Sequence, residues 1–93
     1  MSPTSTFRFR LYVAGQSHNS VLALENLRAL CRQHLRDRHE IEVVDVLRQA
    51  DRALADGILV TPTLLKLSPA PTCRIMGSLA LADVVLATLG LAK

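Results

Sequence analysis

The chain has 93 residues, of which 49% are hydrophobic and 3% aromatic, so we expect one domain over residues 1–93 with an aliphatic core. Its net charge is +3, and its arginines alternate with acidic residues along the chain. This pattern argues against a nucleic-acid-binding protein, which usually carries a basic block with aromatic residues. No apolar run reaches the roughly 20 residues of a membrane span, and the polar start does not resemble a signal peptide. We therefore expect a cytoplasmic protein with reduced cysteines.

The first half of the chain predicts a strand, a helix and a second strand. Alternate residues from Phe7 to Val13 are apolar, which is typical of a strand with one buried face. A helix is expected from about Ser20 to about Leu35. Its inner stripe is Val21, Leu24, Leu27, Leu30, Cys31 and Leu35. The second strand, Glu40 to Leu47, has a β-branched run that is apolar on both faces, so we expect a central strand parallel to the first.

The second half predicts a helix, two strands and a last helix. A short helix from about Ala50 to Ala55 is expected to end at Gly57. Proline is disfavoured inside a central strand, so the third strand should begin at Thr63, after Pro62. A four-residue turn then leads into a short strand from Thr72 to Met76, which indicates an antiparallel hairpin.

The last helix is expected to open at Gly77-Ser78, with Ser78 as its cap, and to end at Gly90. Its inward residues should be Leu81, Val84, Val85 and Leu89. The whole order, with Thr-Pro before the third strand, is the thioredoxin-like pattern. In such folds this proline is commonly cis and lies beside the start of the first helix, and we expect the same of Pro62.

The chain lacks a recognisable catalytic or metal-binding set. Where a redox thioredoxin has Cys-x-x-Cys, this sequence has Ser17-His18-Asn19-Ser20, and Cys31 falls on the apolar stripe as a small core residue. Ser17 could hold a thiolate as in glutathione transferases, but those enzymes need a second helical domain, so helix capping is favoured. We expect no cofactor.

Two further candidates also have structural interpretations. Cys31, His34 and His39 have a spacing that resembles metal ligands, but no clear fourth ligand accompanies them, so surface histidines are favoured. Asp45 near the end of the second strand is expected to be a hydrogen-bonded structural carboxylate, because no second carboxylate is placed to act with it.

Several short segments in a fixed order resemble the KaiB family of cyanobacterial circadian clock proteins. The similarity covers about residues 7–89. Its segments are Leu11-Tyr12-Val13-Ala14-Gly15, Asn19-Ser20-Val21, Ala23-Leu24, Val44-Asp45-Val46-Leu47, Ile58-Leu59-Val60-Thr61-Pro62-Thr63-Leu64 and Arg74-Ile75-Met76-Gly77-Ser78-Leu79. The sensor domain of the clock kinase SasA shares the Thr-Pro-Thr element and is the nearest confusable relative.

The resemblance implies a non-enzymatic adaptor rather than an enzyme. KaiB-like proteins bind the N-terminal ring of the hexameric ATPase KaiC, help to sequester KaiA and displace the SasA kinase. The family is metamorphic: a tetrameric ground state has a different arrangement after about residue 50, and a rare thioredoxin-like monomer binds KaiC. We therefore expect an α/β, thioredoxin-like KaiB fold, or the ground-state arrangement of the C-terminal half, and a homo-oligomer (dimer or tetramer).

The resemblance also implies where a partner binds. The expected contacts are Gly15, Ser17, Asn19, Ser20, Glu40, Glu42, Lys66 and Arg74. Several positions that are usually basic in the family are here Leu22, Glu42, Gly57 and Cys73. These departures favour one alternative, a thioredoxin-like protein-binding or stress-response module that works without KaiC.

Overall fold

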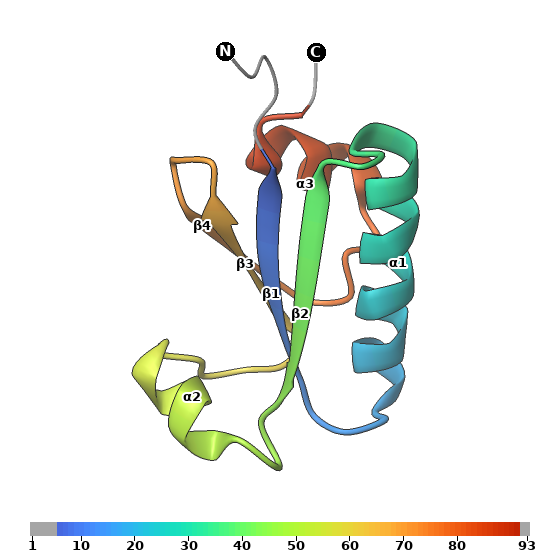
Figure 1. The fold of residues 1–93 in the computed structure, drawn as a ribbon. Helices are drawn as coiled ribbons and strands as arrows, with labels where there is room; N and C mark the ends of the chain where they lie inside the picture. The colour runs from blue at the N-terminus through green and yellow to red at the C-terminus, as the bar shows by residue number, and fades with distance from the viewer. Residues whose placement is uncertain (1–5, 92–93) are drawn as a thin grey trace.

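The computed structural model describes residues 6–91, which form one four-stranded sheet with three helices (Figure 1). The strands are β1 (Phe7–Val13), β2 (His39–Asp45), β3 (Thr63–Ser68) and β4 (Cys73–Met76). The helices are α1 (His18–His34), α2 (Ala50–Ala55) and α3 (Ala82–Leu89). None of the helices in the described residues has the length and apolar character needed to cross a membrane.

The strand order is β2-β1-β3-β4, so β1 and β3 are the central strands. β1 pairs in parallel with β2 and antiparallel with β3, and β3 and β4 form the predicted antiparallel hairpin. The prediction of a central β2 was wrong. β2 is an edge strand that ends at Asp45, and Val43 on it is 40% exposed while Val44 is buried. The β-branched run suits any pleated strand, and it does not distinguish the edge from the centre.

The larger core lies between the sheet and the two helices α1 and α3. The predicted alternation of β1 is confirmed, because Phe7, Phe9, Leu11 and Val13 all enter this core. α1 begins at His18, two residues before the expected start, and buries Ala23, Leu27, Leu30 and Cys31. Val21 of the predicted inner stripe is instead 36% exposed, since the buried stripe passes through Ala23.

The opposite face of the sheet carries a smaller core under α2. Its buried residues are Tyr12, Val44, Ala53 and Leu65. α2 has only six residues and lies near one end of the sheet (Figure 1), so it covers only part of this face. The predicted bounds of α2 are confirmed, and Gly57 after it has the expected positive φ of 67°.

The segment before α3 differs from the prediction. The helix starts at Ala82 with Leu81 in the N-cap position, so Ser78 is not its cap. Leu79 enters the core ahead of the helix, at a positive φ of 65°. Because Leu79 fills this space, α3 needs only Val85 and Leu89 inward, and the expected inward residues Leu81 and Val84 are 71% and 57% exposed. Gly90 ends the helix, as predicted, and the structure gives it the left-handed conformation.

The start of β3 is fixed by a buried proline. The Thr61–Pro62 peptide bond is cis, and the strand begins at Thr63. The Pro62 carbonyl accepts a hydrogen bond of 2.9 Å from the Gly77 amide, which follows the end of β4. This bond joins the two ends of the hairpin.

Candidate partner-binding surface

The part of the sheet that α2 leaves uncovered is a charged, open face. Arg8 and Arg10 of β1 stand opposite Glu40 and Glu42 of β2 in the parallel register. Arg74 of β4 stands opposite Leu65, which itself pairs with Arg10. Side chains alternate between the two faces of a strand, so these charged residues share the face with α2. We call this surface, made of Arg8, Arg10, Glu40, Glu42 and Arg74, the open face.

Glu42 is the centre of an ion network on the open face. Arg10 Nε lies 2.9 Å from one carboxylate oxygen of Glu42, and Arg52 Nη1 of α2 lies 2.6 Å from the other. Hydrogen bonds from Arg52 and then Arg10 lower the Glu42 pKa from 4.5 to about 2. The network thereby ties α2 to both β1 and β2.

Tyr12 and Asp56 extend this network beneath α2. The buried Tyr12 hydroxyl donates to a carboxylate oxygen of Asp56 and lies 3.0 Å from the Arg52 carbonyl. Arg10 Nη1 also reaches Asp56, at 3.0 Å. Desolvation, followed by the hydrogen bond to Asp56, raises the pKa of Tyr12, while the Tyr12 hydrogen bond lowers that of Asp56. The aspartate is therefore held ionised against α2.

Arg74 fastens the end of α2 to the sheet from the other side. Its guanidinium donates to the carbonyls of Asp56, at 2.6 Å, and Gly57, at 2.9 Å. These carbonyls follow the last turn of α2, where a cation also complements the helix dipole. Within residues 6–91, no carboxylate lies at ion-pair distance from Arg74, so its charge stays available to a partner.

The ion network predicts an acid-sensitive fold. The Glu42 pKa is lower in the folded protein than its ordinary value, so its stabilisation is present above about pH 4.5 and is lost as the pH falls toward 2. Urea unfolding at several pH values should show the wild type losing stability over this window and Glu42→Gln losing less. Glu40→Gln is the matched control, because its 3.4 Å pair with Arg8 is mostly exposed. If Glu42→Gln and the wild type lose stability equally over this pH range, the acid sensitivity does not come from Glu42.

The segment from Gly15 to Ser20 forms a tight turn at the end of β1. Asp45 Oδ1 accepts hydrogen bonds from the amides of Leu47, at 2.9 Å, and Gly15, at 3.0 Å, which lower its pKa in that order of size. The expected structural role of Asp45 is thus confirmed. Gly15 has a φ of 53°, and a Cβ there would lie 3.4 Å from Leu47, so glycine suits the position.

The serines of this segment bond to each other rather than cap α1. Ser17 occupies the N-cap position but makes no side-chain cap bond. Its hydroxyl donates to Ser20 Oγ at 2.8 Å, and the buried Ser20 Oγ also accepts from the Ala14 amide at 3.1 Å. Asn19 is exposed between them. Ser17 and Asn19 are therefore accessible, whereas Ser20 supports the turn from below.

Lys66 lies apart from the other expected contacts. Its side chain enters the α3 side of the sheet and the residue is only 4% exposed. Lys66 Nζ donates to the Leu89 carbonyl at 3.3 Å and stands 5.6 Å above the centre of the Phe7 ring. In this conformation Lys66 holds the C-terminal end of α3, and it is not displayed to a partner.

The two cysteines are placed away from the start of α1. Cys31 is fully buried near the far end of that helix, and burial raises its pKa to about 11. Cys73 is partly buried at the start of β4. Neither thiol takes the position that a redox thioredoxin uses, and Cys31 would stay protonated near neutral pH.

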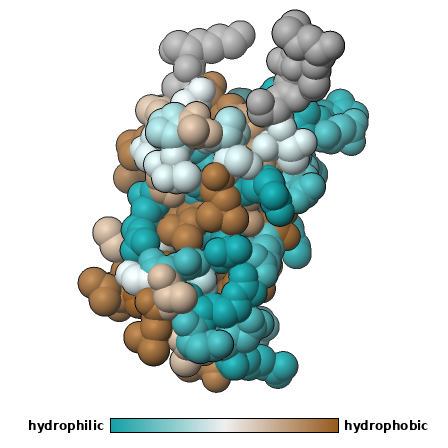
Figure 2. Space-filling model, turned by 60° about the vertical axis from the view of Figure 1, so that its left-hand side comes forward, coloured by the Kyte–Doolittle hydropathy of each residue, from teal (hydrophilic) through white to brown (hydrophobic). Residues whose placement is uncertain are grey.

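Exposed apolar side chains gather at the end of the sheet where β1 and β2 finish. Leu47 follows β2, Leu59 and Val60 precede β3, and Met76 ends β4, with exposures from 49% to 94%. Figure 2 shows apolar atoms at the lower left, the end at which α2 lies in Figure 1. This apolar end adjoins the turn of Gly15, since a Cβ built on Gly15 would lie 3.4 Å from the Leu47 side chain.

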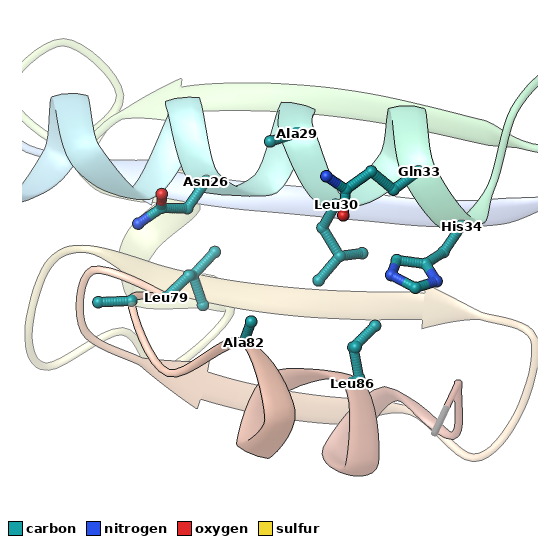
Figure 3. A pocket seen from close by; sticks show the side chains of 9 residues that line it. Asn26, Ala29, Leu30, Gln33, His34, Leu79, Ala82 and Leu86 are labelled. Carbon is teal, nitrogen blue, oxygen red and sulfur yellow. The ribbon is translucent and has the colours of Figure 1, made fainter. Parts of the chain in front are cut away.

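A cavity of about 220 Å³ separates α1 from α3. Figure 3 shows Leu30 and His34 of α1 and Leu86 of α3 pointing toward it from opposite sides. At one end of the cavity, Asn26 Nδ2 donates to the Ser78 carbonyl at 2.8 Å. The seam between the two helices is thus incompletely filled, although Val85, Leu89 and in part Leu86 of α3 pack in the core and Lys66 bonds to the Leu89 carbonyl.

Comparison with known proteins decides the family. The KaiB domain model matches residues 10–91. The chain belongs to the KaiB family. The circadian clock oscillator protein KaiB of Prochlorococcus marinus (strain MIT 9313) is 44% identical over 91 residues, which cover 98% of this chain and 76% of that protein. The circadian clock protein KaiB3 of Synechocystis is 42% identical over 77 residues, or 83% of this chain and 76% of that protein. The resemblance of the short segments is confirmed.

Solved structures similar to this KaiB-family chain share its fold. The N-terminal domain of Synechococcus elongatus SasA has a TM-score of 0.75 at 16% identity and covers 100% of this chain and 91% of that domain. Chloroplastic thioredoxin z has a TM-score of 0.74 at 19% identity, covering 94% and 79%. At such low identity these likenesses concern the fold alone, and they confirm the predicted thioredoxin-like arrangement.

Sequence reasoning missed part of this KaiB-family surface. It did not predict the residues that hold α2 on the sheet, which are Arg10, Arg52, Asp56 and Tyr12. One signal was available: arginine at alternate positions of β1 and glutamate at alternate positions of β2 predict ion pairs once two parallel strands are aligned. The contribution of α2 depends on tertiary packing and has no comparable signal.

Proposed function

We propose that this chain is a non-enzymatic adaptor of a circadian-clock-type system, which binds a KaiC-type hexameric ATPase and modulates its phosphorylation and output signalling. The family match over residues 10–91 supports the clock role. The observation that carries the binding proposal is the open face, where Glu40, Glu42 and Arg74 are exposed together. A single domain over residues 1–93 in the cytoplasm is part of the same proposal.

The proposed contact has two adjoining parts. The open face supplies charged groups, of which Arg74 has no carboxylate partner within the described residues. The apolar end supplies Leu47, Leu59 and Val60 beside the accessible Ser17 and Asn19. An apolar centre with a polar border is the usual composition of a protein interface. Lys66 is left out of this contact, because it is buried beside α3.

A change of conformation is also part of the proposal. The resemblance implies a homo-oligomeric ground state, a dimer or tetramer, in which the segment after about residue 50 is arranged differently. The incompletely filled seam between α1 and α3 is compatible with an α3 that detaches at modest cost. KaiA and a SasA-like kinase pathway would be affected indirectly, through occupation of the ATPase.

The first test is size-exclusion chromatography with light scattering, for the protein alone and after prolonged incubation with its cognate KaiC-type ATPase and ATP. We expect an oligomer that is slowly consumed into a complex with the ATPase. A stable monomer or dimer that never enters a complex at any nucleotide or phosphorylation state would overturn the proposal. That outcome would favour the thioredoxin-like protein-binding module, and unbiased pull-downs would follow.

Arg74→Glu tests the open face directly. Reversing this charge should weaken the ATPase complex by about tenfold or more, because an attractive contact to an acidic partner group becomes repulsive. Arg36→Glu makes the same charge change at an exposed position that follows α1, and it should leave affinity unchanged. Affinity is read by titration, with circular dichroism to verify that both variants fold. Unchanged affinity in Arg74→Glu would assign the contact to another surface.

A further inference from the structure

A second charged surface lies on the other side of the molecule, between α1 and β2. A hollow of about 400 Å³ is lined by Arg28 and Arg32 of α1 and by His39 and Ile41 of β2. Arg28 and Arg32 are four residues apart and lie on one side of the helix. Both arginines are exposed, and no carboxylate lines the hollow.

These two arginines differ from those of the open face. Arg8, Arg10 and Arg52 each have a carboxylate within 3.4 Å, and Arg74 donates to two carbonyls. Across residues 6–91, Arg28 and Arg32 take part in no ion pair and no side-chain hydrogen bond. Two like charges at this spacing repel each other. Within the described residues, the hollow thus brings two arginines together with no carboxylate at ion-pair distance from either.

His39 adds a third nitrogen group with a fixed orientation. Its Nδ1 lies 2.8 Å from the Leu35 carbonyl, which can only accept, so Nδ1 carries the proton. The bond holds the ring at the start of β2. Nε2 of the neutral ring is then an acceptor, so it can donate to an anion only in the doubly protonated imidazolium form. His39 lines the same hollow as the two arginines of α1.

We propose that this hollow is a binding site for a phosphate group. Two guanidinium groups present forked donors that match phosphate oxygens, and a tetrahedral dianion can accept from both arginines at once. A carboxylate has one negative charge and accepts hydrogen bonds in one plane, so it would pair less completely with the guanidinium groups of Arg28 and Arg32. The bound phosphate offsets the repulsion between Arg28 and Arg32. The site is separate from the open face, and it does not depend on the ATPase proposal.

The test is a titration of the whole chain with sodium phosphate and with O-phosphoserine, followed by backbone amide NMR. Sodium chloride at matched ionic strength is the reference. We expect saturable shifts confined to α1 and the start of β2. A response to inorganic phosphate alone assigns the site to free phosphate, a response to O-phosphoserine alone assigns it to a phosphate ester, and a response to both supports a general phosphate site. Linear, non-saturating shifts with both probes would overturn the proposal.

Two variants and one control separate a site from general charge attraction. Arg28→Gln and Arg32→Gln should each weaken phosphate binding by about tenfold, because each removes a charge-assisted contact. Arg48→Gln removes the same charge from an exposed position beyond the opposite end of β2, and it should bind as the wild type does. If Arg48→Gln loses as much affinity as Arg28→Gln, the attraction is non-specific and the proposal fails.

Discussion

Lys66→Ala should lower the free energy of unfolding by about 3 kcal/mol, as removal of a long buried side chain does in other cores. Lys66 is 4% exposed, with its stem packed between the sheet and α3 and its ammonium at the Leu89 carbonyl. Truncation leaves a cavity in this space and a helix-terminal carbonyl without its donor. Urea unfolding gives the free energy, and hydrogen exchange should show the largest loss of protection in α3.

Lys66→Met is the matched control, since it keeps the stem and removes the charge. The ammonium makes one long hydrogen bond of 3.3 Å and one contact to the Phe7 ring, and its burial carries a desolvation cost. We therefore expect Lys66→Met to lower the free energy of unfolding by less than about 1 kcal/mol. If Lys66→Ala and Lys66→Met lower the free energy of unfolding equally, the charge of Lys66 rather than the packing of its stem holds α3.

Tyr12→Phe should lower the free energy of unfolding by about 2 kcal/mol, because it removes a buried donor to an ionised carboxylate. The Tyr12 hydroxyl donates to Asp56 and lies 3.0 Å from the Arg52 carbonyl beneath α2. Phenylalanine keeps the ring in the smaller core and leaves the Asp56 carboxylate without this donor. Chemical denaturation measures the loss, and hydrogen exchange should place it in α2 and the segment that follows.

A double-mutant cycle with Asp56→Ala checks the cause of this loss. The hydroxyl and the carboxylate act on each other, so the two single losses should not add, and the double variant should be more stable than their sum implies. Strict additivity would mean that Tyr12 stabilises the fold through packing alone.

Short-range sequence patterns predicted the strands and helices of this fold correctly where the residues within one element decide its bounds. The alternation of β1, the bounds of α2 and the start of β3 at Thr63 all agree with the structure, because periodicity, glycine and proline act within a few residues. The position of β2 depended on a distant event, the antiparallel pairing of β3 with β1. Which residues of α3 face the core depended on Leu79, which fills the core before the helix begins. Neither event has a local signal.

The expected partner contacts came from the family resemblance, and the structure sorts them in space. Glu40, Glu42 and Arg74 share the open face, and Gly15, Ser17, Asn19 and Ser20 form the turn beside the apolar end. Lys66 follows Leu65 in β3, so its side chain points to the opposite face of the sheet. The alternation of side chains along a strand could have predicted this. The network under α2 required knowledge of which helix covers which face.

The paired charges of the open face bear on how quickly a partner can find it. Arg8, Arg10 and Arg52 are each paired with an acid of the same chain, and within residues 6–91 Arg74 is the arginine of this face without a carboxylate at ion-pair distance, so the face projects only a small net positive field. A protein that approaches it receives little long-range guidance, and capture then depends on collisions that happen to be well oriented. An association rate in the ordinary, weakly steered range would follow from this surface even if every molecule were already in the thioredoxin-like conformation. The encounter rate would then be set by this surface, separately from any change of fold.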